Sequence, residues 1–550
     1  MKRIILLLAI LMSCSVYGQL LTKERGFSKA DTLRGTLGPE RTWFDVTFYN
    51  LKISINPKSK RIEGFNDIHF KVVDPVTKMQ IDLFENLQVD SIMMNNKPLK
   101  YTREFNAVFI EMPVDLKVGE MYALRFYYSG TPTEAEHPPW DGGFVWSKDK
   151  NGKDWIGVAC EGMGASAWWP NKDHLSDEPD SMLISVAVPN DISFVGNGNL
   201  RKRSKEGDMN RYDWFVSYPI NNYNVTVNAG DYVHFGEEYT SPTEGVLALD
   251  YYVLSSNLDK AKEHFKQVKP MMKCFEQYLG PYPFWDDGFA LVETPYLGME
   301  HQGAIAYGNE YKSGYAGNTR FTGGHDFDYI IIHETGHEWW GNSVSCKDIA
   351  DLWIHEGFCT YSESIYVECL NDKEAGITYI NSNKKNVGNK EAIIGPYGVN
   401  KEGSGDMYQK GSLFLNTLRH VINNDKLWWE IILGIATDFK HTVVDTQDII
   451  DYMNDKSNMK LDKIFDQYLR YPDIPTLEYK LEEKGKHTIL SYRWKSDVKG
   501  FDLPMRYQAN NKKWVKIKPS ETWQSVKIKK TKSKNVKLDE RGFYVKLEKK

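Results

Sequence analysis

The sequence predicts a multidomain α+β protein, with a mainly helical domain between an N-terminal antiparallel β domain and a small C-terminal β-sandwich module. The chain has 550 residues, enough for about three or four domains of ordinary size. Strand-like segments come first, helix-like segments follow, and strand-like segments return at the end. Hydrophobic residues make up 41% and charged residues 26% of the chain, a composition typical of globular proteins.

Residues 1–18, MKRIILLLAILMSCSVYG, are typical of a secretory signal peptide. Lys2 and Arg3 precede an apolar run too short to span a bilayer, and small residues stand before a cut at Gln19. The alternative is a short buried helix. Cys14 lies in a weak match to a bacterial lipoprotein box, so a lipid anchor is a second option. We expect an exported protein, periplasmic or extracellular, with no transmembrane segment.

Charge and cysteine content exclude some classes of protein. The net charge of −5 argues against a basic nucleic-acid binder. Six cysteines are present, and removal of a signal peptide containing Cys14 leaves five, widely and irregularly spaced. This spacing is neither a disulfide framework nor a C-x-x-C metal site. We expect most cysteines to be free and buried, with room for one disulfide.

The N-terminal part of the mature chain is expected to be a leader and a β domain. Residues 19–40 are polar and irregular, which favours a loosely attached leader. Residues 41–237 contain short runs of β-branched and aromatic residues separated by Asn, Pro and Gly. Such runs are typical of antiparallel strands.

The pattern changes near residue 238. Residues 238–474 have mostly helical spacing, with one strand-like stretch, FALVETPYLGMEHQGAIAY. Alternation returns in residues 475–550, which are rich in lysine. A solvated β surface is the favoured interpretation of this charge, and a site for an anionic partner is the alternative.

The segment HETGH, residues 333–337, is the clearest chemical motif. His333 and His337 are four residues apart, so on a helix both imidazoles lie on one face and can reach one metal ion. Glu334 projects about 100° away from His333, beside the metal, where it could accept a proton from a water molecule.

A third ligand is expected from Glu356, which lies 19 residues after His337. The first helix could end near Gly341-Asn342, and a second could return antiparallel to it. Two His and one carboxylate leave a fourth position for water, as in hydrolytic zinc sites. His355 is a rival ligand, but adjacent residues of a helix point about 100° apart, so His355 and Glu356 cannot both face the two histidines. We expect one Zn²⁺ per chain, and the alternative is a buried His pair with a structural carboxylate.

The spacing of His333, His337 and Glu356 is that of the gluzincin zinc peptidases. Gly298-Met299-Glu300-His301-Gln302 resembles the G-x-M-E-N signature of the aminopeptidase N and leukotriene hydrolase family. This resemblance implies a thermolysin-like catalytic domain, with Glu300 binding the free α-amine of a substrate and the strand at Gly298 and Met299 pairing with the substrate backbone. His301 departs from the usual Asn.

Other segments extend the resemblance over nearly the whole mature chain. WWGN after His337 resembles the family's W-F-G-N, and Tyr408 begins a Y-x-K-G segment in which the Tyr stabilises an oxyanion. Glu161 precedes a W-P-x-x-D segment at the spacing of the family's second amine-binding residue. Glu363 follows Glu356 by two helical turns, where it could accept a hydrogen bond from a ligand His.

The resemblance therefore implies a zinc aminopeptidase that acts on peptides with a free N-terminus. Glu334 would be the general base, and Tyr408 would donate a hydrogen bond to the oxyanion. Two alternatives are a thermolysin-like zinc endopeptidase and a non-catalytic peptide-binding relative. A third, epoxide hydrolysis, relies in this family on a long C-terminal helical domain with no counterpart in these segments.

Overall fold

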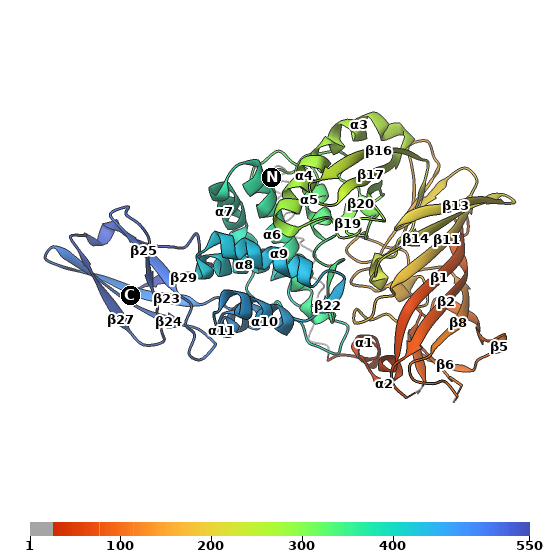
Figure 1. Cartoon of the computed structure of the whole chain (residues 1–550), viewed down its shortest axis with the longest axis horizontal. Coiled ribbons are helices and arrows are strands. Elements are labelled where there is room, and N and C mark those ends of the chain that lie inside the picture. Colours follow the sequence, from red (N-terminus) through yellow and green to blue (C-terminus); the bar gives the residue numbers. More distant parts are fainter. Residues whose placement is uncertain (1–25, 76–77, 114) are drawn as a thin grey trace, which may run out of the picture.

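The computed structural model describes residues 26–75, 78–113 and 115–550, so the predicted signal peptide and Cys14 lie outside the described residues. Three bodies follow one another along the long axis of the molecule (Figure 1). A β domain lies at one end, a helical domain in the middle and a second β module at the other end. No helix within the described residues is long and apolar enough to cross a membrane.

The N-terminal domain is built on an eight-stranded sheet, with a four-stranded and a three-stranded sheet beside it. Alternation produces this sheet, since Leu51, Ile53 and Ile55 on one face of a strand are all buried. The large sheet runs in the order β13 (Asn199–Glu206), β14 (Met209–Val216), β11 (Ser181–Pro189), β1 (Phe44–Asn56), β2 (Arg61–Val72), β8 (Met121–Gly130), β4 (Leu87–Met94), β5 (Lys97–Pro98). The smaller sheets are β12 (Ser193–Val195), β15 (Asn228–Gly230), β10 (Asp154–Ala159), β9 (Gly143–Lys148), and β3 (Met79–Asp82), β7 (Ala107–Ile110), β6 (Tyr101–Glu104).

One strand pair departs from the antiparallel prediction. β1 and β11 are parallel neighbours, with Leu51 opposite Ile184. Other strands and loops of the domain lie between them in the sequence, so β11 can return in the same direction as β1.

The expected loose leader is wrong for residues 26–40. They contain helix α1 (Lys29–Gly35) and the first half of α2 (Pro39–Thr42). Ser28 and Asp31 form a capping box at the start of α1, and Pro39 occupies the first turn of α2. Both signals are present in the sequence, so the polar composition of this segment was a poor guide to its structure.

The middle domain begins with its own sheet, in which β17 pairs with β16 on one side and with β18 of the catalytic region on the other. The order is β16 (Tyr232–Ser241), β17 (Gly245–Leu254), β18 (Phe289–Glu293), β20 (Ile305–Tyr307), β19 (Gly298–Met299). The expected boundary at residue 237 falls inside β16. Strands of both domains have the same alternation, and only their pairing partners assign them to a domain.

Helices make up the rest of the middle domain. They are α3 (Leu258–His264), α4 (Val268–Leu279), α5 (Tyr329–Gly336), α6 (Trp353–Leu370), α7 (Lys373–Ser382), α8 (Gln409–Ile422), α9 (Asp425–Asp438), α10 (Thr446–Ser457), α11 (Asp462–Leu469), with the strand pair β21 (Val344–Cys346) and β22 (Thr442–Val444). A disulfide joins Cys274 on α4 to Cys369 at the end of α6, and Cys160, Cys346 and Cys359 are free and buried.

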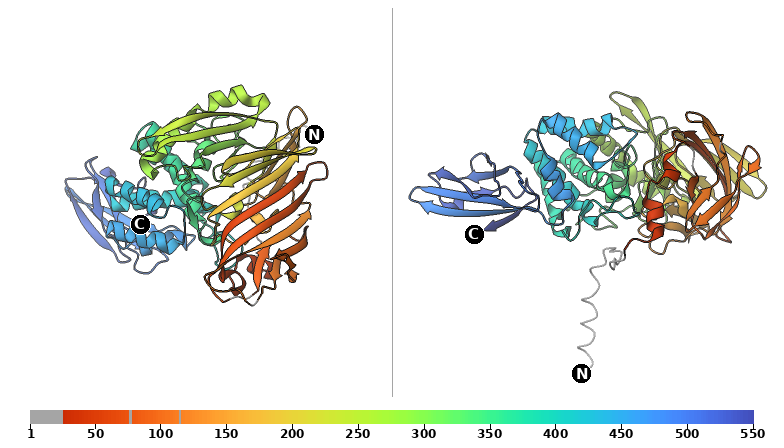
Figure 2. Two further views of the ribbon diagram at one scale, coloured as in Figure 1. Left: turned by 45° about the vertical axis from the view of Figure 1, so that its right-hand side comes forward. Right: turned by 90° about the horizontal axis from the view of Figure 1, so that it is seen from below.

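The C-terminal module consists of two small sheets, and Trp494, Leu503 and Met505 are among its buried residues. It projects from the helical domain, as the second view of Figure 2 shows. The sheets are β27 (Gln524–Lys529), β24 (His487–Lys495), β23 (Thr476–Lys484), β29 (Lys546–Lys549), and β26 (Val515–Ile517), β25 (Met505–Ala509), β28 (Val536–Leu538).

Candidate active site

Helix α5 presents the two histidines of the HETGH motif to the interior. Asp328 caps the helix by accepting hydrogen bonds from the backbone N–H groups of Ile330 and Ile331. The helix ends at Gly336, earlier than the expected Gly341-Asn342. His337 keeps helical angles of φ −65° and ψ −21°, so its ring still lies beside that of His333.

Helix α6 packs on α5 and brings Glu356 to the two imidazoles. His333 Nε2 and His337 Nε2 are 3.3 Å apart, and Glu356 Oε2 lies 3.6 Å from the first and 3.5 Å from the second. A tetrahedral zinc ion with bonds of about 2.0–2.1 Å separates its ligand atoms by roughly 3.3–3.4 Å. The three atoms therefore have the spacing of a zinc ligand set.

The hydrogen bonds around these three residues fit a metal site. Glu363 Oε1 accepts a hydrogen bond from His333 Nδ1 at 2.8 Å, and the Trp340 carbonyl accepts one from His337 Nδ1 at 2.9 Å. Both Nε2 atoms are thereby directed at the common point. Glu356 Oε2 is buried and has no hydrogen-bond partner among the described residues, which is costly unless a cation binds it. Tyr379 donates a hydrogen bond to the other oxygen of Glu363.

The rival ligand His355 is held elsewhere. Its Nε2 accepts a hydrogen bond from the backbone N–H of Cys346 at 2.8 Å, and burial lowers its pKa to about 3. Cys359 lies close to the His333 and His337 rings, but its thiol donates to the His333 carbonyl at 2.8 Å.

Glu334 and Glu300 face each other beside the metal-ligand atoms. One oxygen of each lies within 4.8 Å of the other and of a ring nitrogen of His337. A Cβ at Gly298 would stand 3.0 Å from Glu334 Oε1, so glycine leaves the space that this carboxylate occupies. Burial raises the pKa of Glu334 to about 7.

Glu300 follows β19, the outermost strand of its sheet, which contains Gly298 and Met299. Tyr223 from the β domain donates a hydrogen bond to Glu300 Oε1 at 3.0 Å. No local sequence pattern points to Tyr223, because its partner lies 77 residues away. His301 is fully buried, and burial lowers its pKa to about 3.

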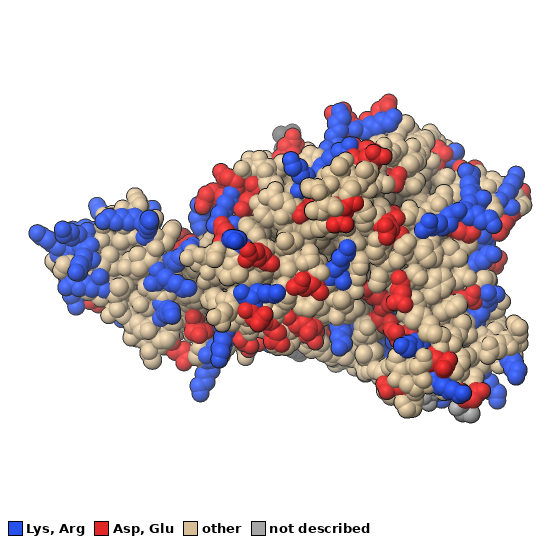
Figure 3. All heavy atoms as spheres, in the orientation of Figure 1, with Lys and Arg blue, Asp and Glu red and all other residues tan. Residues whose placement is uncertain are grey.

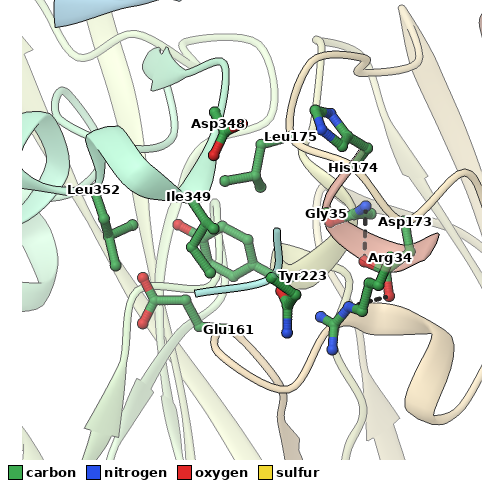
Figure 4. A pocket seen from close by; sticks show the side chains of 12 residues that line it. Arg34, Gly35, Glu161, Asp173, His174, Leu175, Tyr223, Asp348, Ile349 and Leu352 are labelled. Atoms are coloured by element: carbon green, nitrogen blue, oxygen red, sulfur yellow. Dashed lines mark hydrogen bonds and ion pairs between the residues drawn. The ribbon is translucent and has the colours of Figure 1, made fainter. Parts of the chain in front are cut away.

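Glu161 comes from the loop after β10 in the β domain and lines a small cavity (Figure 4). The cavity runs between the two domains, with Arg34 of α1 and Asp173 at the end opposite Glu161. Glu161 Oε1 is buried without a hydrogen-bond partner among the described residues. Burial, followed by the charge of Glu300, raises the pKa of Glu161 well above its ordinary value.

Tyr408 stands at the start of α8 with its hydroxyl in the site. The hydroxyl donates a hydrogen bond to Glu356 Oε1 at 2.9 Å, on the oxygen opposite the unpartnered one. The rest of its motif is structural. Gly411 lets α8 approach α6 closely, since a Cβ there would lie 2.9 Å from Gly357 Cα, and Lys410 donates to the carbonyls of Tyr471 and Pro472.

Comparison with known proteins identifies similar chains. Residues 263–468 match the model of the peptidase family M1 domain. Aminopeptidase N of Lactobacillus helveticus is 23% identical over 470 residues, covering 80% of this chain and 52% of the relative. The puromycin-sensitive aminopeptidase of Caenorhabditis elegans is 20% identical over 490 residues, covering 82% of this chain and 49% of the relative. This chain spans about half of the length of each.

The solved structures with similar folds include an M1 zinc metallopeptidase from Deinococcus radiodurans bound to a Tyr-Ser-Ala substrate. The TM-score is 0.67 at 18% identity, and the match covers 79% of this chain and 96% of the other. This likeness concerns the fold. Residues 263–468 therefore form a domain of peptidase family M1, and the chain is similar to aminopeptidase N and to the puromycin-sensitive aminopeptidase over most of its length.

Proposed function

We propose that this protein is a zinc aminopeptidase that removes the N-terminal residue from peptides. The observation that carries the proposal is the pair of carboxylates, Glu161 and Glu300, beside the metal-ligand atoms of His333, His337 and Glu356. Glu161 Oε1 has no hydrogen-bond partner among the described residues, and within the same part of the chain the Glu300 carboxylate accepts a single side-chain hydrogen bond, from Tyr223. A substrate ammonium group would supply both the missing donors and the missing positive charge.

The position of this pair would determine where the peptide is cut. Glu300 and Glu334 are within 4.8 Å of each other, so an ammonium bound at Glu300 places the first peptide bond of a substrate near Glu334. The outer edge of β19 is available for pairing with the substrate backbone.

In this mechanism, a bound zinc ion would polarise the scissile carbonyl and lower the pKa of a water molecule. Glu334 accepts the proton from the attacking water and delivers it to the leaving amine. Tyr408 turns its hydroxyl from Glu356 Oε1 to the developing oxyanion. As a neutral phenol, it can donate that hydrogen bond at neutral pH.

Matched aminoacyl anilides with free and acetylated amines test the proposal. We expect hydrolysis of the free-amine substrate, loss of activity with a chelator, and rejection of the acetylated substrate, because acetylation removes the charge that the carboxylates bind. Efficient internal cleavage of an N-blocked peptide would replace the proposal with the endopeptidase alternative. A stable metal complex without hydrolysis of either substrate would favour a binding protein.

A variant of Glu300 sharpens this test. Glu300→Ala should lower kcat/KM for free-amine substrates by at least about tenfold, while acetylated substrates stay poor. Glu293→Ala is the matched control, because Glu293 is a buried carboxylate of the same sheet that accepts hydrogen bonds from the Leu254 N–H and the Asn257 side chain. An equal loss in both variants would assign the effect to folding.

Export is a separate part of the proposal and is supported only by the first 18 residues. Expression in a Gram-negative host and intact-mass analysis should give a chain that begins at Gln19. A chain cut before Cys14 and carrying acyl groups would establish the lipid anchor instead. An unprocessed chain would contradict export.

A further inference from the structure

Charge is distributed very unevenly along this chain. Residues 475–550 contain 21 Lys and Arg against 9 Asp and Glu, a net charge of +12. The whole chain has a net charge of −5, so residues 1–474 carry −17. The small C-terminal module is therefore strongly basic on an otherwise acidic protein.

The lysines gather at the end of the module that lies farthest along the molecule, where Figure 3 shows a cluster of basic side chains. Strand pairing brings them together. Lys484 is opposite His487 in one strand pair and His487 is opposite Lys529 in the next. Asn510, beside the turn at Lys512, donates a hydrogen bond to the Lys530 carbonyl. The resulting lysine pole consists of Lys484, Lys486, Lys512, Lys513, Lys529, Lys530, Lys532, Lys534 and Lys537, all exposed.

Little negative charge compensates the pole. Lys484 pairs with Glu482 at 3.5 Å and Lys532 with Glu483 at 3.3 Å. The other seven lysines form no ion pair with any residue that the structure describes. Folding stability gains nothing from such a cluster of like charges, because neighbouring ammonium groups repel one another.

Apolar side chains lie beside the charges. Trp514 and Val515 follow directly after Lys513 and are 40% and 44% exposed. Lysine with exposed tryptophan is a combination typical of surfaces that settle at the boundary between lipid headgroups and acyl chains.

The kind of cation indicates the kind of partner. Residues 475–550 contain 18 lysines and three arginines, and each arginine forms an ion pair with a carboxylate. Arginine forms two-pronged hydrogen bonds with individual phosphates and bases, whereas lysine acts as a point charge. A protruding set of point charges fits an extended surface of negative charge better than it fits a discrete phosphate or a nucleic-acid groove.

We propose that the lysine pole docks the protein on an anionic lipid bilayer. Trp514 then enters the headgroup region, and the catalytic domain stays on the aqueous side. This proposal does not depend on the peptidase activity, because the pole contains no residue of the candidate active site.

Sedimentation of the full chain with vesicles tests the proposal. Vesicles of phosphatidylcholine with about 30 mol% phosphatidylglycerol should bind the protein at about 50 mM salt and release it at about 500 mM, where screening is stronger. Vesicles of pure phosphatidylcholine should not bind it. A variant with Lys512, Lys513, Lys529, Lys530 and Lys534 changed to Gln should bind at least about 100-fold more weakly, since each lysine near the surface contributes to binding.

The matched control changes five exposed lysines of the β domain to Gln: Lys58, Lys97, Lys100, Lys117 and Lys205. It has the same loss of charge and should keep vesicle binding. Circular dichroism and hydrolysis of an aminoacyl anilide should be unchanged in both variants. The proposal would be overturned if the control lost binding equally or if the protein bound neutral vesicles. It would also be overturned if the protein bound heparin, DNA or a second copy of the chain but not anionic vesicles.

Discussion

At the scale of single residues, Tyr408 and Glu356 form the most informative contact. The tyrosine hydroxyl donates to one oxygen of Glu356, while the other oxygen faces the two histidines without a hydrogen-bond partner among the described residues. The same hydroxyl could thus orient a metal ligand before substrate binds and serve the oxyanion afterwards. These two roles predict different effects of mutation, one on metal retention and one on turnover.

Tyr408→Phe should lower kcat by about 100- to 1,000-fold with little change in KM, because its hydrogen bond to the oxyanion forms mainly in the transition state. Steady-state kinetics with an aminoacyl anilide and elemental analysis measure both roles. Tyr361→Phe is the control, since Tyr361 is a buried tyrosine that accepts a hydrogen bond from Trp428, outside the cleft. An effect on KM alone would assign Tyr408 to substrate binding in the ground state.

Glu334→Gln should keep the fold and the zinc while hydrolysis falls by at least about 100-fold, because the substitution removes only the proton acceptor. Metal content by elemental analysis and kcat from initial rates give the two readouts. If kcat stayed within a few-fold of the wild type, another group would have to accept the proton.

Glu363→Gln should weaken zinc binding by about 10- to 100-fold, because a neutral amide supports the His333 ring less well than a carboxylate. Competition with a chelator measures the affinity. Tyr379→Phe, which removes only the hydrogen bond to Glu363, should have a smaller effect in the same direction. Identical affinities in the wild type and Glu363→Gln would show that His333 is held without this carboxylate.

At the scale of elements, the short helices α1 and α2 join the β domain to the catalytic domain. Arg41 of α2 is fully buried and bonds Asp82 together with the carbonyls of Arg34 and Thr36. Thr36 in turn donates to the Gly398 carbonyl at 2.7 Å. The segment that precedes Tyr408 is therefore held against the leader, and Arg34 of α1 lines the cavity that also contains Glu161.

Arg41→Met should destabilise the protein by about 3–5 kcal/mol, because it leaves the Asp82 carboxylate buried without its cation. Burial already raises the pKa of Asp82 in the presence of Arg41. Urea unfolding measures the change. The double variant Arg41→Met/Asp82→Leu should recover much of the lost stability. An unfolding free energy of Arg41→Met within about 0.5 kcal/mol of the wild type would contradict the role of the pair.

At the scale of the whole molecule, the free energy of unfolding depends on pH through buried ionisable groups, and two of these groups act in opposite directions. Burial is the main cause that lowers the pKa of His174 to about 4, below the ordinary value of 6.5. The unfolded chain therefore takes up a proton first, and stability is lost as pH falls from 6.5 to 4. Burial raises the pKa of Glu178 to about 7 from 4.5, so its contribution is lost as pH rises through that interval.

Two variants separate these effects. The stability of His174→Asn relative to the wild type should rise by up to about 3 kcal/mol as pH falls from 6.5 to 4. The stability of Glu178→Gln relative to the wild type should rise by a similar amount as pH rises from 4.5 to 7. Urea unfolding at several pH values provides the data. Parallel curves for the wild type and either variant would exclude that residue as a source of the pH dependence.

The signals that worked in the sequence were local ones. His333, His337 and Glu334 lie on one helix, so their geometry follows from helical periodicity, and a second helix at the right distance brought Glu356 to them. The prediction placed the end of this helix near Gly341-Asn342, later than its actual end at Gly336, because the sequence continues with apolar residues. The capping box at Ser28 is also a local signal of a helix, but the polar composition of the segment favoured an irregular structure.

The metal-ligand motif and the succession of strand-rich and helix-rich regions can be predicted from the sequence alone, since both depend on residues close together in the chain. Three features become visible only in the folded protein: β16 belongs to the catalytic sheet, Tyr223 donates a hydrogen bond to Glu300, and Glu161 shares one cavity with Arg34. These contacts join residues far apart in sequence. Their formation depends on how complete domains pack, because close packing and the pairing of buried polar groups are properties of the assembled interior.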